Sequence, residues 1–204
     1  MYDLAHSNPE IMKREFGVIG EQLYAMSWGV DRSIIRNKYI PTAKSYSNSQ
    51  VLNRDYYDQR QIEIVIREIG EQVAARIRAH DLRTGRIGLF IGYSFDSIDL
   101  DHPRGGFKVQ KKISPTNDNH DLTTQLIDLF RSKWRGEGVR NIGVDYGNLS
   151  LDTSQQFTLF VKPTLQVKRK TLDKTVDNLR KKYGFSSVVK ASSLLPGATA
   201  IKRS

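Results

Sequence analysis

The stretch from Arg86 to Ile113, RIGLFIGYSFDSIDLDHPRGGFKVQKKI, reads as two neighbouring strands joined by a loop. Apolar side chains alternate with small, polar or cationic ones along both strands: Ile87, Leu89 and Ile91 in the first, Phe107, Val109 and Ile113 in the second. Because strand side chains point to opposite faces with period two, one face of the pair is apolar and the other is rich in glycine and lysine. Such a sheet suits a phosphate backbone, although an ordinary half-exposed sheet has the same pattern.

The segments around this pair predict a strand–helix–strand–strand–helix–strand order. A polar strand covers residues 45–52, an amphipathic helix runs from Arg60 to His80, a second helix runs from about Asp118 to Trp134, and Ile142, Val144 and Tyr146 alternate along a last strand. This is the split βαβ arrangement, an α+β fold. Each helix has one apolar stripe to bury, so we expect both helices on the apolar face of a four-stranded sheet, with the other face bare.

A small helical segment is expected before this domain, at residues 1–33. Asn8 followed by Pro9 is typical of a helix start, and a second helix is expected to follow a turn formed by residues 17–20. This resembles a helix-hairpin-helix, whose turn would offer the backbone amides around Gly17 and Gly20 to a phosphate, although a plain glycine-bearing turn has the same spacing. Two short helices cannot bury a core, so this segment is expected to lean on other structure.

The last quarter of the chain is basic and has weaker patterns. Residues 151–170 show little helical periodicity, whereas apolar residues recur at helical spacing from Leu172 to Tyr183 among several lysines. The end, SSLLPGATAIKRS, is small and polar, and we expect it to be loosely held. Together these features predict a partly helical basic tail.

Composition narrows the partners and the compartment. The net charge is +10 over 204 residues, and residues 151–204 hold eleven basic and three acidic side chains. An excess of this size indicates a polyanionic partner, but its place in the tail does not identify the sheet as the binding face. The chain has no cysteine, which excludes disulfide scaffolds and thiolate metal sites. A polar start and the lack of any long apolar run predict a cytoplasmic protein with no membrane partner.

No motif indicates a catalytic or metal site. The four histidines are scattered without ligand spacing, and Asp96, Asp99 and Asp101 lack the glycine and closing glutamate of a calcium loop. The sequence also lacks a Ser-His-Asp set and a phosphate-cradling loop. We therefore expect no catalytic residue, metal or cofactor in this chain.

Several segments, in order, resemble one family. YDLAHSNPEIMKREFGVIGEQLYAMSWGVDRS is similar to the second half of the thumb domain of Y-family (translesion) DNA polymerases. KSYSNSQVLNRDY and VRNIGV resemble the first and last strands of their little finger domain, and KTLDKTVDNLRKKYGFSSVVKASSLLPGATA resembles the tails of the bacterial UmuC/ImpB/MucB/SamB-like branch. The resemblance implies a partial thumb at 1–33, a linker at 34–44, a DNA-binding little finger at 45–150, and a clamp-binding peptide with a tail at 151–204.

The resemblance also separates this chain from the polymerase chemistry. The family's palm domain, with its catalytic carboxylates and two magnesium ions, would lie before Met1. The full-length parent would then be an error-prone polymerase of the SOS response, and this chain is expected to be inactive alone.

What the resemblance carries over is a grip on the backbone of primer-template DNA. It implies these DNA-binding residues: Gly17, Gly20, Lys44, Ser45, Tyr46, Ser47, Arg86, Gly88, Lys108, Gln110, Lys112, Arg140 and Asn141. Asp145 departs from the family pattern, in which a basic residue is common at this position. An acid that faces phosphates would weaken the grip of the last strand.

A second implied partner is the bacterial sliding clamp. The peptide at 156–160, QFTLF, resembles the clamp-binding motif, with Gln156, Phe157, Leu159 and Phe160 as the expected contacts. Physically it is an extended segment with anchors for an apolar pocket. A strand that tucks its phenylalanines into the domain would have the same sequence. SOS accessory proteins are further possible partners of the tail.

Two other functions fit the same residues. An RNA-binding split βαβ module would need aromatic side chains on the open face of its third strand, whereas Phe107 is in register with the apolar side. A non-catalytic protein-interaction domain of a DNA repair protein would use the tail instead of the sheet.

Overall fold

The computed structural model describes residues 1–34, 36, 44–97, 105–153 and 163–203. The chain divides into two units, residues 1–42 and residues 43–204. Four strands form one antiparallel sheet in the second unit: β1 (Tyr46–Tyr56), β2 (Leu82–Tyr93), β3 (Gly106–Thr116) and β4 (Val139–Leu151). Their order across the sheet is β1-β4-β2-β3, so β4 lies between two strands that a helix connects. This confirms the predicted α+β fold and its split βαβ order.

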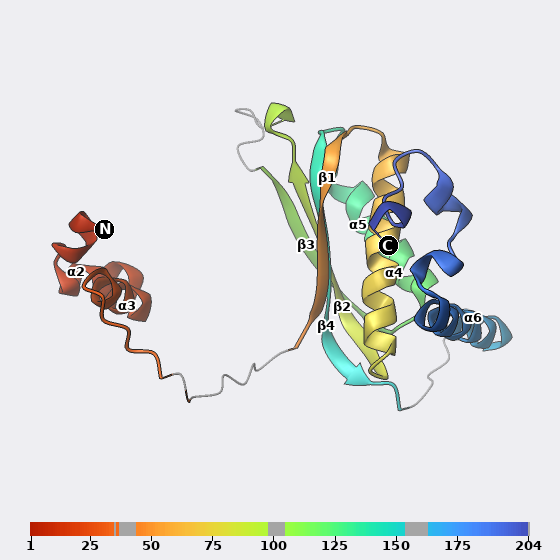
Figure 1. The fold of residues 1–204 in the computed structure, drawn as a ribbon, viewed down its shortest axis with the longest axis horizontal. Coiled ribbons are helices and arrows are strands. Elements are labelled where there is room, and N and C mark those ends of the chain that lie inside the picture. Colours follow the sequence, from red (N-terminus) through yellow and green to blue (C-terminus); the bar gives the residue numbers. More distant parts are fainter. Residues whose placement is uncertain (35, 37–43, 98–104, 154–162, 204) are drawn as a thin grey trace. The chain divides into compact units, whose positions relative to one another are not determined.

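Two helices, α4 (Gln59–Arg78) and α5 (Asn119–Lys133), cover one face of this sheet (Figure 1). Each begins after an aspartate cap: the Asp58 and Asp118 side chains accept hydrogen bonds from backbone N–H groups of the first turn, at 2.8 and 3.0 Å. A short 3-10 helix, η1 (Phe95–Ser97), follows β2. The two long helices occupy the face that the apolar alternation predicted.

The core lies between the sheet and these helices. Fully buried side chains from the two central strands include Ile87, Leu89, Ile91, Ile142 and Tyr146. They pack against the apolar stripes of α4 and α5. Because one face of the sheet is fully used in this way, the alternate residues of each strand project on the side away from the helices.

The tail is more ordered than the sequence predicted. It contains α6 (Pro163–Tyr183) and the 3-10 helices η2 (Phe185–Ser187), η3 (Ala191–Leu194) and η4 (Ile201–Arg203). The Glu68 carboxylate of α4 accepts three hydrogen bonds, from the Thr199 N–H, the Thr199 hydroxyl and the Ala200 N–H, at 2.9, 3.1 and 2.9 Å. The expectation of a loosely held end was therefore wrong. The expectation of little helix over 151–170 was also wrong from Pro163 onward.

The first unit holds three short helices, α1 (Tyr2–Ala5), α2 (Pro9–Phe16) and α3 (Val18–Ser27). The expected four-residue turn is a single residue, Gly17, with a φ of 60°. Gly20 lies inside α3 and is buried against the Met12 carbonyl of α2. Of the residues described in the helices of this unit, only Met12, Gly20 and Ala25 are buried. In the part of the chain that the structure describes, no helix is long and apolar enough to span a membrane.

Candidate nucleic-acid interface

The face of the sheet away from the helices, called here the open face, is small, polar and partly cationic. Its rows follow the strand pairing: Ser47, Asp145, Gly88 and Gln110 form one row, Ser49, Gly143, Phe90 and Lys108 the next, and Gly147, Arg86 and Lys112 a third. Five of these eleven residues are glycine or serine, and all five lie on β1, β2 and β4. The open face is therefore low in relief, which lets an extended polymer approach the strands closely.

Arg86 and Asp145 form an ion pair across the open face. The Arg86 Nη2 atom donates to the Asp145 Oδ2 atom at 2.8 Å, and both side chains are between one fifth and one third exposed. Gly88 makes room for this pair, since a Cβ added at Gly88 would collide with the Asp145 carboxylate. Arg86 thereby neutralises the acid that would otherwise repel phosphates. Because its guanidinium is paired with Asp145, Arg86 itself is less available to bind a phosphate.

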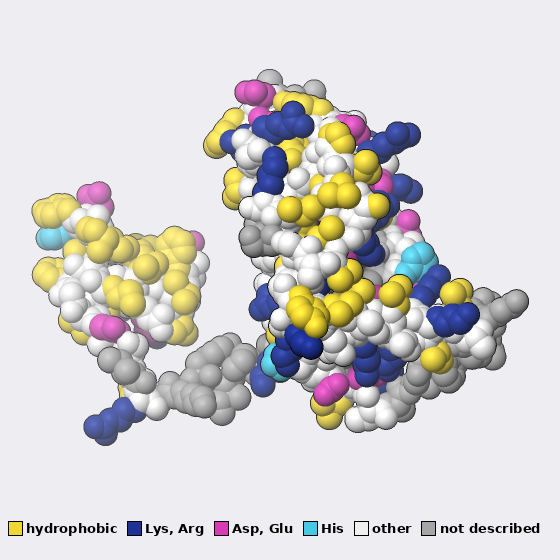
Figure 2. Space-filling view, turned by 45° about the vertical axis from the view of Figure 1, so that its right-hand side comes forward, with side chains coloured by type: hydrophobic (Ala, Val, Ile, Leu, Met, Phe, Trp, Pro, Cys, Tyr) yellow, Lys and Arg dark blue, Asp and Glu magenta, His cyan; other side chains and the backbone are white. Residues whose placement is uncertain are grey.

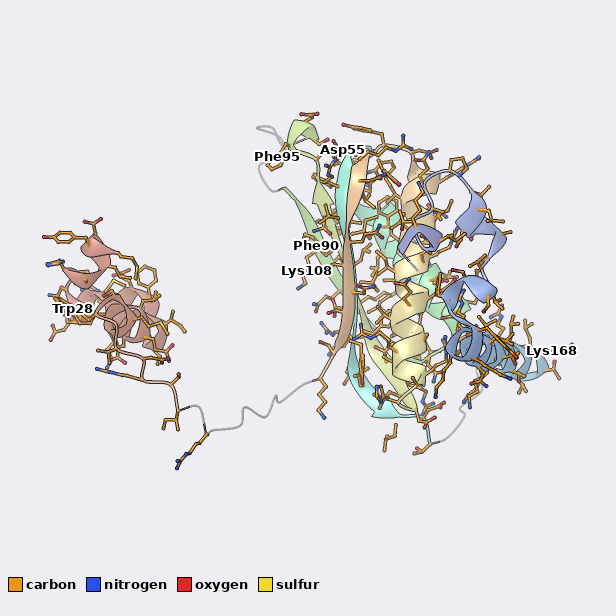
Figure 3. The ribbon with its side chains drawn as sticks, viewed as in Figure 1. Trp28, Asp55, Phe90, Phe95, Lys108 and Lys168 are labelled. Carbon is orange, nitrogen blue, oxygen red and sulfur yellow. The ribbon has the colours of Figure 1, made fainter. Side chains whose placement is uncertain are left out.

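Lys108 and Lys112 supply the unpaired charge of the open face. Both are exposed on β3, on the same side as Gln110, and neither forms an ion pair with a described residue. They lie four residues apart, or about 13 Å along the strand. Figure 3 shows Lys108 and Phe90 projecting from the side of the sheet opposite α4. These two lysines are thus the side chains best placed to neutralise phosphates.

Arg140 and Asn141 lie at a bulge near the start of β4. The β2–β4 pairing shifts by one residue between Gly92 and Tyr93, so two residues separate the buried Val139 and Ile142. Arg140 is exposed, but its Nη1 atom donates to the Asp55 Oδ1 atom at 3.1 Å. The bulge thus leaves Arg140 and Asn141 between these two buried residues. Arg140 is already paired with Asp55.

The remaining predicted DNA contacts are spread more widely. Lys44 and Ser45 are exposed just before β1. The Tyr46 side chain packs on the helix side, with its ring centroid 5.7 Å from that of His80, so it does not lie on the open face. Gly17 and Gly20 belong to the first unit. The predicted clamp contacts, Gln156, Phe157, Leu159 and Phe160, lie outside the described residues.

Sequence reasoning missed three open-face residues: Ser49, Gly143 and Gly147. The alternation that identified Ile142, Val144 and Tyr146 as core residues already placed the two glycines opposite them. It also placed Phe90 among the small residues of β2, where it is 37% exposed. Phe107, by contrast, packs against the core side near Tyr93, with ring centroids 6.2 Å apart. The third strand therefore lacks the exposed aromatic that an RNA-binding module of this fold would need.

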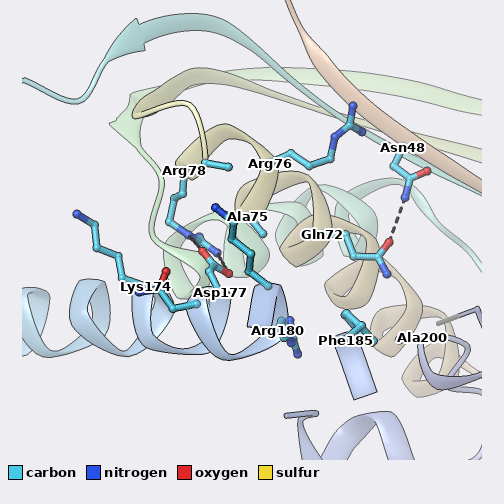
Figure 4. Close-up of a pocket in the computed structure, with 13 residues that line it drawn as sticks. Asn48, Gln72, Ala75, Arg76, Arg78, Lys174, Asp177, Arg180, Phe185 and Ala200 are labelled. Atoms are coloured by element: carbon cyan, nitrogen blue, oxygen red, sulfur yellow. Dashed lines mark hydrogen bonds and ion pairs between the residues drawn. The ribbon is translucent and has the colours of Figure 1, made fainter. Parts of the chain in front are cut away.

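A separate cleft of about 910 Å³ lies between α4, α6 and the tail (Figure 4). Among the described residues of its lining, Asp177 is the one carboxylate, and it accepts hydrogen bonds from Arg78 at 2.7 and 3.1 Å. The other charged residues of its lining are cations: Arg76, Lys174, Arg180 and Lys181. The cleft is thus basic, but it lies on the helix side of the sheet and is no part of the open face.

The sequence matches one family model and several curated proteins. A family model described as the impB/mucB/samB family C-terminal domain matches residues 43–159, more than half of the chain. The chain is 35% identical to "Putative UV-damage repair protein UvrX" of Bacillus subtilis, over 95% of this chain and 45% of that protein. It is 28% identical to "DNA polymerase IV 2" of the same organism, over 95% of this chain and 46% of that protein.

A shorter match adds to these. The chain is 35% identical to "DNA repair protein homolog YobH" of Bacillus subtilis, over 63% of this chain and 57% of that protein. The chain spans about half the length of the curated relatives it matches.

Proposed function

Since the chain belongs to the impB/mucB/samB family through its C-terminal domain, we propose that its sheet holds primer-template DNA for a translesion DNA polymerase. The observation that carries the proposal is the open face, with small glycine and serine residues on β1, β4 and β2 and the unpaired Lys108 and Lys112 on β3. Backbone contacts carry no direct sequence readout, so this grip suits duplexes of any sequence. Relatives named DNA polymerase IV support the assignment to a polymerase.

The first unit contributes a second contact in this proposal. Gly17 caps α3 without a side-chain hydrogen bond, and the first residues of that helix, Val18 and Ile19, are 67% and 59% exposed. The Gly17 N–H donates to the Lys13 carbonyl at 2.8 Å and the Gly20 N–H donates to the Gly17 carbonyl at 3.0 Å, so the N–H groups of Val18 and Ile19 are the ones left for an anion such as a phosphate. Contacts from these backbone N–H groups to phosphates, like those from the lysines, do not depend on the DNA sequence.

The decisive measurement is the salt dependence of duplex binding. If about four phosphates are neutralised, the logarithm of the binding constant should fall against the logarithm of the salt concentration with a slope of roughly −3 to −4. Changing Lys108 and Lys112 together to alanine should flatten that slope by about two units, because each lysine releases about one counterion. Fluorescence anisotropy with a labelled primer-template duplex gives the slope.

A matched control uses lysines away from the open face. Lys181 and Lys182 lie on α6, and their double alanine variant has the same net charge as the β3 variant. It should keep the parent slope. An unchanged slope for the β3 variant, or an equal loss in both variants, would show that the open face is not the DNA face.

We further propose that residues 156–160 recruit the polymerase to a sliding clamp. The support is the resemblance of QFTLF to the clamp-binding motif and its place between β4 and α6. A buried apolar anchor contributes about 2 kcal/mol or more to such a contact. Losing both Leu159 and Phe160 should therefore weaken binding roughly a thousand-fold.

Calorimetry against a bacterial sliding clamp tests the peptide. The Leu159→Ala, Phe160→Ala variant should show no measurable binding and should keep its melting temperature and its affinity for duplex DNA. A variant that binds the clamp as well as the parent, or that unfolds, would mean that the segment is part of the core.

A further inference from the structure

Helix α6 turns its apolar side chains away from the domain. Leu165, Leu172 and Leu179 recur every seven residues, and Val176 and Tyr183 follow the last two by four residues; we call these five residues the apolar stripe. The side chains of Leu165, Leu172, Leu179 and Tyr183 are 43%, 62%, 37% and 62% exposed. No side chain described in α6 is buried, and none belongs to the core.

Charged and polar groups on another side of α6 hold it to the domain instead. Asp173 accepts from the Asn119 backbone N–H and side-chain amide at 3.0 and 2.9 Å. Asp177 accepts two hydrogen bonds from Arg78, and the Lys170 ammonium lies 2.9 Å from the Asp152 carboxylate. An amphipathic helix ordinarily buries its apolar stripe. Here the polar side of α6 contacts the domain, and the apolar stripe has no partner in the described structure.

The width of the stripe indicates what kind of partner it fits. A helix that covers a globular core has an apolar face wider than about 100°, whereas a narrow stripe with a seven-residue repeat is the seam of a helix pair. The stripe spans nineteen residues from Leu165 to Tyr183, or about 27 Å of helix. It contains no Trp or Phe and is too narrow for the broad apolar face that a lipid surface selects.

The charge around the stripe indicates the charge of the partner surface that would bind there. Seven lysines and arginines lie in α6 against two aspartates, and both aspartates are engaged in docking the helix. Lys168 and Lys182 border one side of the stripe, and Figure 3 shows Lys168 projecting from α6. In Figure 2, Lys and Arg side chains are spread over the visible face of the larger unit. A second copy would set two such cationic helices against each other, which charge repulsion opposes.

We propose that the apolar stripe of α6 docks an acidic amphipathic helix of another protein. The stripe supplies the seam, and the flanking cations pair with glutamates or aspartates at the edges of the partner helix. The site lies on the tail, separate from the open face, so it can be occupied while the sheet holds DNA.

The test uses the full chain and a synthetic probe. The probe is a fluorescein-labelled peptide of three heptads with leucine at positions a and d and glutamate at e and g. Its glutamates disfavour self-pairing. Anisotropy should show saturable binding, and Leu172→Glu should weaken it about ten- to a hundredfold, the effect of one leucine lost from a seam. A peptide with lysine in place of glutamate should not bind.

Thr171→Glu is the matched control, since it adds the same charge beside the stripe on an exposed residue. It should keep most of the affinity. Melting curves and duplex DNA binding should be the same for all three proteins, which separates this site from the proposed DNA face. Loss of probe binding with intact DNA binding in Leu172→Glu supports the proposal.

Other outcomes overturn it. The absence of probe binding, or equal binding by the Leu172→Glu variant, would show that the stripe is no helix-docking surface. Sedimentation of the parent as a dimer that Leu172→Glu dissociates would assign the stripe to a second copy of the chain. Binding to phosphatidylserine vesicles that the same substitution abolishes would assign it to a membrane surface.

Discussion

Gly70 illustrates how tightly single residues are fitted around the core. It lies within α4, and its carbonyl accepts a hydrogen bond from the Tyr146 hydroxyl of β4 at 3.1 Å. Alanine in place of glycine inside a helix usually stabilises by about 1 kcal/mol. Here the added Cβ would lie 2.9 Å from the Leu126 Cδ1 atom and 3.1 Å from the Tyr146 oxygen. Overpacking costs about 1–3 kcal/mol, so Gly70→Ala should destabilise the protein by about 1 kcal/mol net.

Urea unfolding of the parent and the Gly70→Ala variant measures this effect. Adding Tyr146→Phe removes one of the two crowding atoms, so the penalty for alanine at position 70 should be smaller in that background. A Gly70→Ala protein more stable than the parent would mean that the helix accommodates the methyl group.

The sequence predicted on which face of the sheet a side chain lies, but it did not predict which residue that side chain pairs with. Alternation along β4 placed Asp145 on the open face, where it does lie. Its neutralisation by Arg86 depends on the pairing of β4 with β2. Arg86 and Asp145 are 59 residues apart in the chain, and no local pattern reports the register that brings them together. The same holds for Arg140 and Asp55, which a bulge brings together.

At the scale of elements, Glu63 links the two helices that cover the sheet. Its carboxylate accepts from Arg131 of α5 at 2.7 and 2.9 Å and from Gln59 at 2.8 Å. Burial by itself would raise the pKa of Glu63, but these hydrogen bonds and the nearby guanidinium charges outweigh it and lower the pKa below its usual 4.5. A lowered pKa in the folded state means that the unfolded chain binds the proton first as the pH falls.

Glu63 should therefore stabilise the fold fully above pH 4.5, and its contribution should disappear as the pH falls through its lowered pKa. Thermal melts of the parent and of Glu63→Gln between pH 3 and pH 7 measure it. Their difference in stability should be largest at neutral pH and should shrink towards pH 3. A constant difference would mean that the Glu63 charge is not what joins the helices.

The elements of the sheet domain were predictable because their signals are local. Period-two alternation and helical stripes follow from which face of each element meets the core, and aspartate caps mark where α4 and α5 begin. The order of the tail was not predicted, because polar contacts and not apolar ones attach it to the sheet domain. Carboxylates and cations hold α6, and Glu68 holds the segment at Thr199, so no hydrophobic period reports either contact.

On the scale of the whole molecule, the two units differ in how much core they have. Residues 43–204 enclose a continuous apolar core between the sheet and two long helices. In the first unit many large apolar side chains are more than half exposed, among them Tyr2, Phe16, Val18, Ile19 and Trp28. A chain of about forty residues seldom folds alone without disulfides, metals or association, so the two units should differ sharply in autonomy.

We expect residues 43–204, produced alone, to melt cooperatively at the same temperature as the main transition of the full chain, because their core is complete. Residues 1–42 alone should give a weak helical circular dichroism signal that declines gradually on heating, since so few of their side chains are buried. Calorimetry of the full chain and both pieces makes the comparison. For a domain of this size a shift of about 4 °C corresponds to roughly 1 kcal/mol or more. A larger shift on removing residues 1–42 would show that the two units stabilise each other, and a cooperative transition of the short piece would show that its few buried residues suffice.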